Sequence, residues 1–216
     1  MRKTAWLLAL LAPLAMVGHA AGLSVRIVDG HGAPVADAVV TVVSRVAAPA
    51  ASAQPPRTRV VDQKNLTFVP YIEVFRPGDS VVFRNSDNTR HHVYSFSPAK
   101  AFEFVLAPGQ SSAPLVLDRS GVVAVGCNIH DRMIAYLYIS DAPWIAHSGA
   151  EGRVSFDGLP AGAYEVRVWQ PRLRPNKPDL AQIATVLADA DPQTLTFTLS
   201  LLPDPRTQFD REHTSY

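Results

Sequence analysis

The chain contains the segment Ser120-Gly-Val-Val-Ala-Val-Gly-Cys127-Asn-Ile-His130-Asp-Arg-Met133. Its first half is a short apolar run, rich in β-branched residues, that follows a Ser-Gly turn, and this pattern predicts a strand. Its second half places a thiol, an imidazole and a thioether within seven residues. Sulfur and imidazole ligands together favour a soft, polarizable metal ion. The segment therefore predicts a β-strand that ends in a metal-binding loop.

A second imidazole would complete a known ligand set. Two histidines and one cysteine in a plane, with a weak methionine on the axis, form the electron-transfer type of copper site. The pair His91-His92 lies 36 residues before the cysteine and offers the missing histidine. A strand from His91 to Phe96 would alternate its faces, so that only one of the pair could point at the metal. The other would lie on the opposite face or hydrogen bond to a ligand.

Each of these residues also has a simpler interpretation. A buried cysteine often acts as a small apolar side chain, and a methionine beside a strand often belongs to the core. The combination is more specific, because the single cysteine and the only methionine after residue 20 lie six residues apart around a histidine. A structural zinc site fits less well, since it needs four strong ligands. A nucleophilic Cys–His pair is also conceivable, but the sequence shows no oxyanion element beside it.

Two further motifs precede this loop in the stretch from Val60 to Ser140. They are Phe68-Val-Pro70 and Pro77-Gly-Asp-Ser-Val-Val-Phe-Arg-Asn85. Together with the Cys-x-x-His-x-x-Met spacing, they resemble the cupredoxins, and within that family the amicyanin and plastocyanin-like blue copper proteins. The stretch is also similar to periplasmic proteins named for methylamine utilisation. The resemblance implies a Greek-key β-sandwich that holds one type 1 copper ion, alternating between Cu(I) and Cu(II).

The resemblance also implies roles for particular residues. It makes His91, Cys127 and His130 equatorial ligands and Met133 the axial ligand. Asn85 stands six residues before His91, which is the family's interval and selects His91 rather than His92. The residues that it places around the ligands are His92, Asn85, Asn128 and Asp131. His92 stands where the family often has an asparagine, so the hydrogen bonding around the thiolate departs from the family pattern.

The flanks carry a second resemblance. The run from Val25 to Val42 resembles the opening of a carboxypeptidase-regulatory-like or transthyretin-like sandwich, and Gly152 to Trp169 resembles its continuation. We therefore expect an all-β chain in which a cupredoxin is inserted into, or flanked by, a second small Ig-like sandwich. The alternative is that residues 22–45 form an arm of the cupredoxin. Pairing of Ala38 to Val43 with the C-terminal strands would support insertion, and pairing with the cupredoxin sheets would contradict it.

The N-terminus resembles an export signal. Two basic residues precede an apolar run from Trp6 to Val17, and Gly18-His19-Ala20 supplies small residues for cleavage. No other stretch is apolar enough for a membrane helix. The expected divisions are a signal peptide (1–20), first strands of the small sandwich (21–45), an Ala/Pro-rich linker (46–58), the cupredoxin (59–141), the rest of the small sandwich (142–203) and a polar tail (204–216). The segment Leu180 to Ala190 is compatible with either a strand or a short helix.

The composition excludes several classes of protein. With 20 basic and 19 acidic residues, the chain lacks the basic excess of a nucleic-acid binder, and its 47% hydrophobic content excludes a disordered protein. One cysteine cannot form a disulfide framework. We expect a periplasmic one-electron carrier between redox proteins such as a cytochrome or a dehydrogenase, and not an enzyme. The alternatives are copper binding or delivery without redox turnover, and a structural or ligand-binding sandwich with a vestigial copper site.

Overall fold

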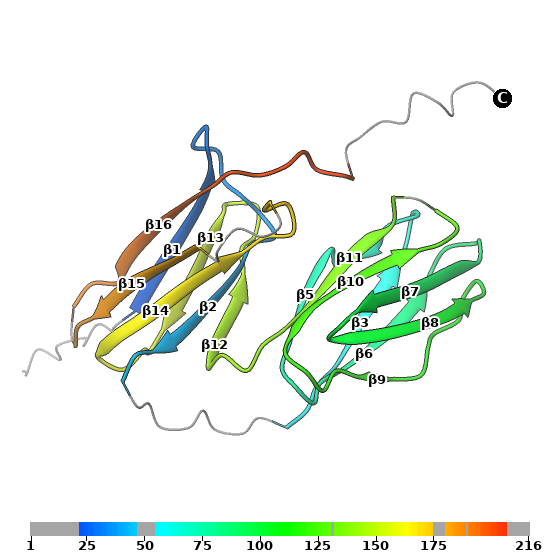
Figure 1. The fold of residues 1–216 in the computed structure, drawn as a ribbon, viewed down its shortest axis with the longest axis horizontal. Helices are drawn as coiled ribbons and strands as arrows, with labels where there is room; N and C mark the ends of the chain where they lie inside the picture. Colours follow the sequence, from blue (N-terminus) through cyan, green and yellow to red (C-terminus); the bar gives the residue numbers. More distant parts are fainter. Residues whose placement is uncertain (1–21, 47–54, 131, 175–179, 189, 207–216) are drawn as a thin grey trace, which may run out of the picture.

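The computed structural model describes residues 22–46, 55–130, 132–174, 180–188 and 190–206. Within these ranges the chain forms 16 strands and no helix, which confirms the all-β prediction. No helix in this part of the chain could therefore cross a membrane. The expected signal peptide and most of the Ala/Pro-rich linker lie outside the described residues. Figure 1 shows two separate groups of strands, one built from both ends of the described chain and the other from its middle.

The first group is a sandwich of two sheets. Its smaller sheet has the order β13-β1-β16 and its larger sheet the order β12-β2-β14-β15. The strands are β1 (Gly22–Asp29), β2 (Val39–Ser44), β12 (Trp144–His147), β13 (Arg153–Asp157), β14 (Gly162–Trp169), β15 (Leu180–Val186) and β16 (Gln193–Leu199). Strand β1 pairs antiparallel with β13 and parallel with β16, so the first strand of the fold lies between two of the last.

The position of β2 distinguishes insertion from an N-terminal arm. Strand β2 pairs antiparallel with both β12 and β14, with Val42 opposite Trp144 on one side and Val166 on the other. None of its described ladder partners belongs to the middle group of strands. This is the pairing that insertion requires. The first two strands therefore complete a sandwich whose other strands follow more than 90 residues later.

The middle group is a second sandwich of two sheets, with the orders β5-β11-β10-β7-β8 and β4-β3-β6-β9. Its strands are β3 (Thr58–Gln63), β4 (Phe68–Val69), β5 (Ile72–Phe75), β6 (Ser80–Asn85), β7 (His91–Ser97), β8 (Lys100–Leu106), β9 (Leu115–Val116), β10 (Gly121–Cys127) and β11 (Ile134–Ile139). Strand β7 lies between β8 and β10, which brings the start of β7 beside the end of β10.

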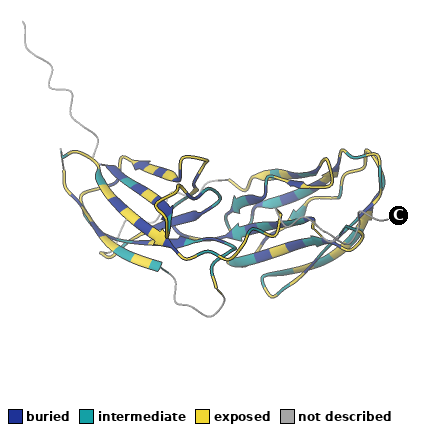
Figure 2. Cartoon of the chain, turned by 90° about the horizontal axis from the view of Figure 1, so that it is seen from above, coloured by how far each residue is buried: buried dark blue, intermediate teal, exposed yellow. Residues whose placement is uncertain are grey.

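Burial alternates along most strands, because one face of each sheet packs on a core and the other faces outward (Figure 2). Val61 and Phe83 of the four-stranded sheet share a core with Val93, Val123 and Leu137 of the five-stranded sheet. The alternation also distinguishes between the two structures expected for Leu180 to Ala190. From Leu180 to Val186 the burial has a period of two and the segment pairs with β14, so the helix alternative for Leu180 to Ala190 was wrong.

The two sandwiches meet through an aromatic interface. The ring of Trp169, at the end of β14, lies 5.8 Å from Tyr136 and 5.2 Å from Tyr138, both on the outward face of β11. Val39 and Ile72 are buried in the same cluster. Trp169 is therefore an aromatic residue of the interface between the two sandwiches. This interface covers the β5–β11 half of the sheet face.

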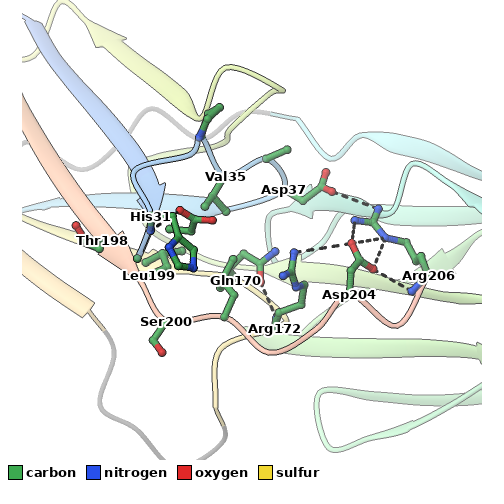
Figure 3. A pocket seen from close by; sticks show the side chains of 15 residues that line it. His31, Val35, Asp37, Gln170, Arg172, Thr198, Leu199, Ser200, Asp204 and Arg206 are labelled. Carbon is green, nitrogen blue, oxygen red and sulfur yellow. Dashed lines mark hydrogen bonds and ion pairs between the residues drawn. The ribbon is translucent and has the colours of Figure 1, made fainter. Parts of the chain in front are cut away.

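The start of the C-terminal tail contacts both sandwiches. Arg206 forms ion pairs with Asp204 and Asp37, and its guanidinium lies 3.7 Å from the ring centre of Tyr71. Figure 3 shows Arg206, Asp204 and Asp37 at the edge of a polar cavity of about 550 Å³ that Arg172 also lines. The hydrogen bond from Arg206 holds the pKa of Asp204 below its ordinary value. The tail is therefore anchored as far as residue 206.

Candidate metal centre

The structure brings three predicted ligands together at one end of the middle sandwich. His91 opens β7, Cys127 closes β10, and the two strands pair with Cys127 opposite Val93. His130 lies in the loop that leads from β10 to β11. The Sγ atom of Cys127 is 3.6 Å from Nδ1 of His91 and 3.7 Å from Nδ1 of His130. One possible ligand atom from each of these residues lies within 4.8 Å of the other two.

These separations fit a shared metal ion. Bonds of about 2.3 Å to sulfur and about 2.0 Å to nitrogen place the two ligand atoms about 3.5 Å apart at a tetrahedral angle and about 3.7 Å apart at a trigonal one. Both observed sulfur–nitrogen distances, 3.6 and 3.7 Å, fall in this interval. The donor set of one thiol and two imidazoles is also the equatorial set of an electron-transfer copper site. The residues present therefore fit copper.

The alternation of β7 separates the two adjacent histidines, as predicted. His91 is fully buried, whereas His92 is half-buried and faces the other side of the strand. His92 donates a hydrogen bond through Nε2 to Glu103, at 2.8 Å. Its Nδ1 lies 3.4 Å from the side-chain amide nitrogen of Asn128. His92 therefore contacts Glu103 and Asn128 on one face of β7, while His91 contacts Cys127 on the other face.

Met133 lies at the far end of the ligand loop and is buried, with 2% of its surface exposed. Two backbone hydrogen bonds close the loop, from the Met133 N–H to the His130 carbonyl and from the Cys127 N–H to the Met133 carbonyl. Met133 belongs to the same core cluster as Cys127, and both line one apolar cavity. The loop thus places the thioether residue beside the thiol residue, inside the fold.

Asn85 organises the connection that leads to His91. It is fully buried, and its side-chain amide donates to the carbonyls of Thr89 and Leu106. Its side-chain oxygen accepts the N–H of Asp87 at 3.0 Å. Asn85 therefore acts on the turn before β7 and not on the thiol. Of the other residues predicted near the ligands, Asn128 donates its N–H to the His92 carbonyl, and Asp131 lies outside the described residues.

Asp87 is a site residue that the sequence reasoning missed. Its carboxylate accepts a hydrogen bond from Nε2 of His91, at 2.9 Å. Burial by itself would raise the pKa of Asp87, but hydrogen bonds from Leu66, His91 and Asn65 outweigh burial and lower the pKa. An available signal was the acidic residue four positions before a candidate ligand. That signal is weak, because surface turns often contain aspartate.

Tyr94 was missed as well. It stands opposite Gly126 in the β7–β10 ladder, one residue before Cys127. Its ring lies against the glycine backbone and lines the apolar cavity beside the thiol. Sequence alone gave no reason to connect the tyrosine with the glycine, since the contact depends on the strand register.

No family model matches this chain, and no curated protein matches it either. Among solved structures, it is similar to amicyanin from Paracoccus versutus, with 18% identity over 46% of this chain and 98% of that one and a TM-score of 0.36. A mutant of amicyanin with Cu(I) matches at 17% identity over 38% of this chain and 82% of that one, again with a TM-score of 0.36. A copper-containing nitrite reductase from Thermus scotoductus SA-01 matches at 22% identity over 44% of this chain, with a TM-score of 0.36. The matched part is 25% of the nitrite reductase chain.

Proposed function

We propose that this chain is a periplasmic type 1 copper protein that carries one electron between redox partners. Its copper ligands would be His91, Cys127 and His130 in the plane, with Met133 on the axis. The observation that supports this best is the convergence of two imidazole Nδ1 atoms on one Sγ atom, at 3.6 and 3.7 Å. Copper bound to one thiolate and two imidazoles can exchange a single electron between Cu(I) and Cu(II).

Burial and hydrogen bonds hold these ligands in position, which suits electron transfer. His91 is fully buried, and Nε2 of its ring is bound to Asp87. Cys127 is fixed at the end of a central strand, and the ligand loop is closed by backbone hydrogen bonds. A ligand set that is already in place needs little rearrangement when the charge on the metal changes. The fold therefore supplies the preorganisation that fast electron exchange requires.

His130 would be the exit for the electron. It is the half-buried member of the three, while His91 and Cys127 are buried. Ile129 beside it is half exposed. A partner such as a cytochrome or a dehydrogenase could approach the imidazole edge beside Ile129. On this proposal the chain exchanges electrons without transforming a substrate, and so it is not an enzyme.

The rest of the proposal concerns organisation and location. Residues 1–20 would direct export and be removed, and the protein would act in the periplasm. The middle sandwich would be a cupredoxin unit inserted into a carboxypeptidase-regulatory-like sandwich. In an oxidising compartment, ligation by the metal and burial would both protect the single thiol of Cys127 from oxidation.

The test is to purify the exported chain without metal, add Cu(II), and record the visible spectrum and the redox titration. We expect an intense thiolate-to-copper charge-transfer band, a stoichiometry of one copper per chain, and a reversible one-electron titration. The band should vanish in Cys127→Ser. The control His147→Ala, which changes an exposed histidine of the other sandwich, should keep it. Binding of zinc alone, or copper binding without the band, would contradict the proposal.

A further inference from the structure

The ring of His91 is held from both sides. Its Nε2 lies 2.9 Å from Oδ2 of Asp87, and its Nδ1 lies 3.6 Å from Sγ of Cys127. A carboxylate accepts hydrogen bonds, so Asp87 requires the ring proton on Nε2. That tautomer leaves the lone pair of Nδ1 directed toward Cys127. Because the ring is fully buried, water does not compete for either nitrogen.

The carboxylate of Asp87 is itself held by an unusual turn. The N–H of Asn65 donates to Oδ1 at 2.5 Å, and the N–H of Leu66 donates to Oδ2 at 3.0 Å. Both residues have φ of 55°, in the left-handed region. Asparagine tolerates that region, but leucine adopts it only at an energetic cost. Backbone hydrogen bonds between Lys64 and Thr67 close the turn.

The strained turn has a clear structural result, because it points two consecutive N–H groups at one carboxylate. Asp87 is thereby fixed by two backbone donors at the same time as it binds the His91 ring. Strain of this kind persists where the surrounding structure maintains it, often beside a functional site. The turn comes directly after β3, whereas Asp87 follows β6, so two connections combine to orient one imidazole.

The neighbouring His92 provides a natural comparison. Its Nε2 also meets a carboxylate, that of Glu103, at 2.8 Å. The Glu103 side chain is 60% exposed, whereas that of Asp87 is 10% exposed. The adjacent residues His91 and His92 thus each bind a carboxylate. The His91 pair is enclosed and its imidazole faces the thiol, whereas the His92 pair is open to solvent and its imidazole faces away from the thiol.

We infer that Asp87 is a positioning residue that fixes the His91 tautomer and strengthens His91 as a donor, and that it thereby favours Cu(II) over Cu(I) at this site. The inference rests on the proposed copper function. A negatively charged acceptor on the remote nitrogen increases the basicity of a metal-bound imidazole. The more basic donor stabilises the more highly charged ion. Asp87 therefore lowers the reduction potential of the site.

The first measurement needs no metal. The ¹⁵N shifts of the His91 ring in the metal-free full chain, recorded by NMR, show which nitrogen carries the proton. We expect the proton on Nε2 and none on Nδ1. A proton on Nδ1 would overturn the inference, whatever the protein does with copper.

The second measurement uses Asp87→Asn, which keeps the size of the side chain and removes its charge. We expect the charge-transfer band to persist, Cu(II) affinity to fall about 10-fold relative to Cu(I), and the potential to rise by about 59 mV, the value of a tenfold change for one electron. The conservative Asp87→Glu, which keeps the charge, should bring the potential back toward the wild-type value. If Asp87→Asn does not fold, Asp87→Ser, which also removes the charge, replaces it. The matched control Glu103→Gln should leave the potential at the wild-type value.

The outcomes separate the two proposals. Wild-type protein that gives no charge-transfer band with Cu(II) would refute the proposed function, while the tautomer measurement would still stand. A wild-type band with an unchanged potential in Asp87→Asn would overturn the role of Asp87 and leave the copper function intact. Equal shifts in Asp87→Asn and Glu103→Gln would also overturn it, because a general charge effect would then explain the result.

Discussion

The phenol ring of Tyr94 lies directly on the backbone of Gly126, so closely that a β-carbon at position 126 would come 2.9 Å from Cζ of the ring. The two residues face each other across the β7–β10 ladder. Since Gly126 precedes Cys127, the tyrosine packs against the strand that presents the thiol. The absence of a side chain at position 126 is what allows this packing.

Gly126→Ala should therefore disturb both stability and the site. The ring of Tyr94 or the end of β10 must move, and we expect a loss of about 1–3 kcal/mol in the free energy of unfolding, as for other overpacked positions. Denaturant unfolding of the metal-free protein measures the loss, and the charge-transfer band after Cu(II) addition reports on Cys127. The double variant Gly126→Ala/Tyr94→Ala should recover much of the band. Wild-type stability and spectrum in Gly126→Ala would show that the contact is unimportant.

The two adjacent histidines should differ sharply when each is replaced. His91→Ala removes a buried ring that contacts Cys127, and we expect loss of the charge-transfer band. His92→Ala removes a half-buried ring that binds Glu103, and the band should remain. We would compare the charge-transfer bands of the two variants in visible spectra at equal Cu(II) concentration. Circular dichroism would verify that both variants are folded. The opposite result would mean that the ligand was chosen wrongly.

Met133→Leu tests whether the thioether acts as a ligand or only fills the core. The change conserves volume, so the metal-free protein should lose less than about 1.5 kcal/mol of stability. If the sulfur is an axial ligand, its removal should raise the reduction potential, because the axial donor tunes such sites. Voltammetry of the copper-loaded variant checks this. An unchanged potential and spectrum would assign Met133 to the core alone.

Trp169→Ala should weaken the contact between the sandwiches and leave the metal centre unaffected. The ring is half-buried between Tyr136 and Tyr138, so we expect a loss of about 2 kcal/mol, below the range for fully buried aromatic residues. Denaturant unfolding measures it. Because the ring contacts the outward face of β11, the charge-transfer band should not change. Loss of the band in a folded variant would show that the interface supports the site.

The ion pair at the tail should make stability depend on acid pH. The pKa of Asp204 is lowered chiefly by the hydrogen bond from Arg206, so its contribution is fully present above the unfolded pKa of about 3.9. It is lost as the pH falls through the folded value. Asp204→Asn should therefore reduce stability at pH 7 by about 0.5–1 kcal/mol, and the difference from wild type should shrink below pH 4. Melting temperatures across this range test it, and a difference that is constant with pH would contradict it.

Much of this architecture was predictable from residues close together in the sequence. The alternation from His91 to Phe96 separated the two histidines, and the Cys127 to Met133 spacing identified the loop. Asp87 and Tyr94 were not predictable in the same way. Their contacts depend on how the turn at Asn65 meets the turn before β7, and on the register of β7 with β10, which are long-range properties. The helix alternative at Leu180 arose because a short apolar run has no decisive period until its partner strand is known.

The order in which the chain builds the two sandwiches has a thermodynamic consequence. The chain enters the middle sandwich at Thr58, the start of β3, and leaves it at Ile139, the end of β11. Thr58 pairs with Ser80 and Ile139 pairs with Gly121. Entry and exit therefore lie at the end of the sandwich away from Asn85 and Cys127. Folding of the middle sandwich returns its two chain ends to one side, which lowers the entropy cost of bringing β2 onto β14. A ligand that binds the folded middle sandwich raises its stability by mass action. Such a ligand would also shift the folding equilibrium of β1, β2 and β12–β16, although it touches none of them.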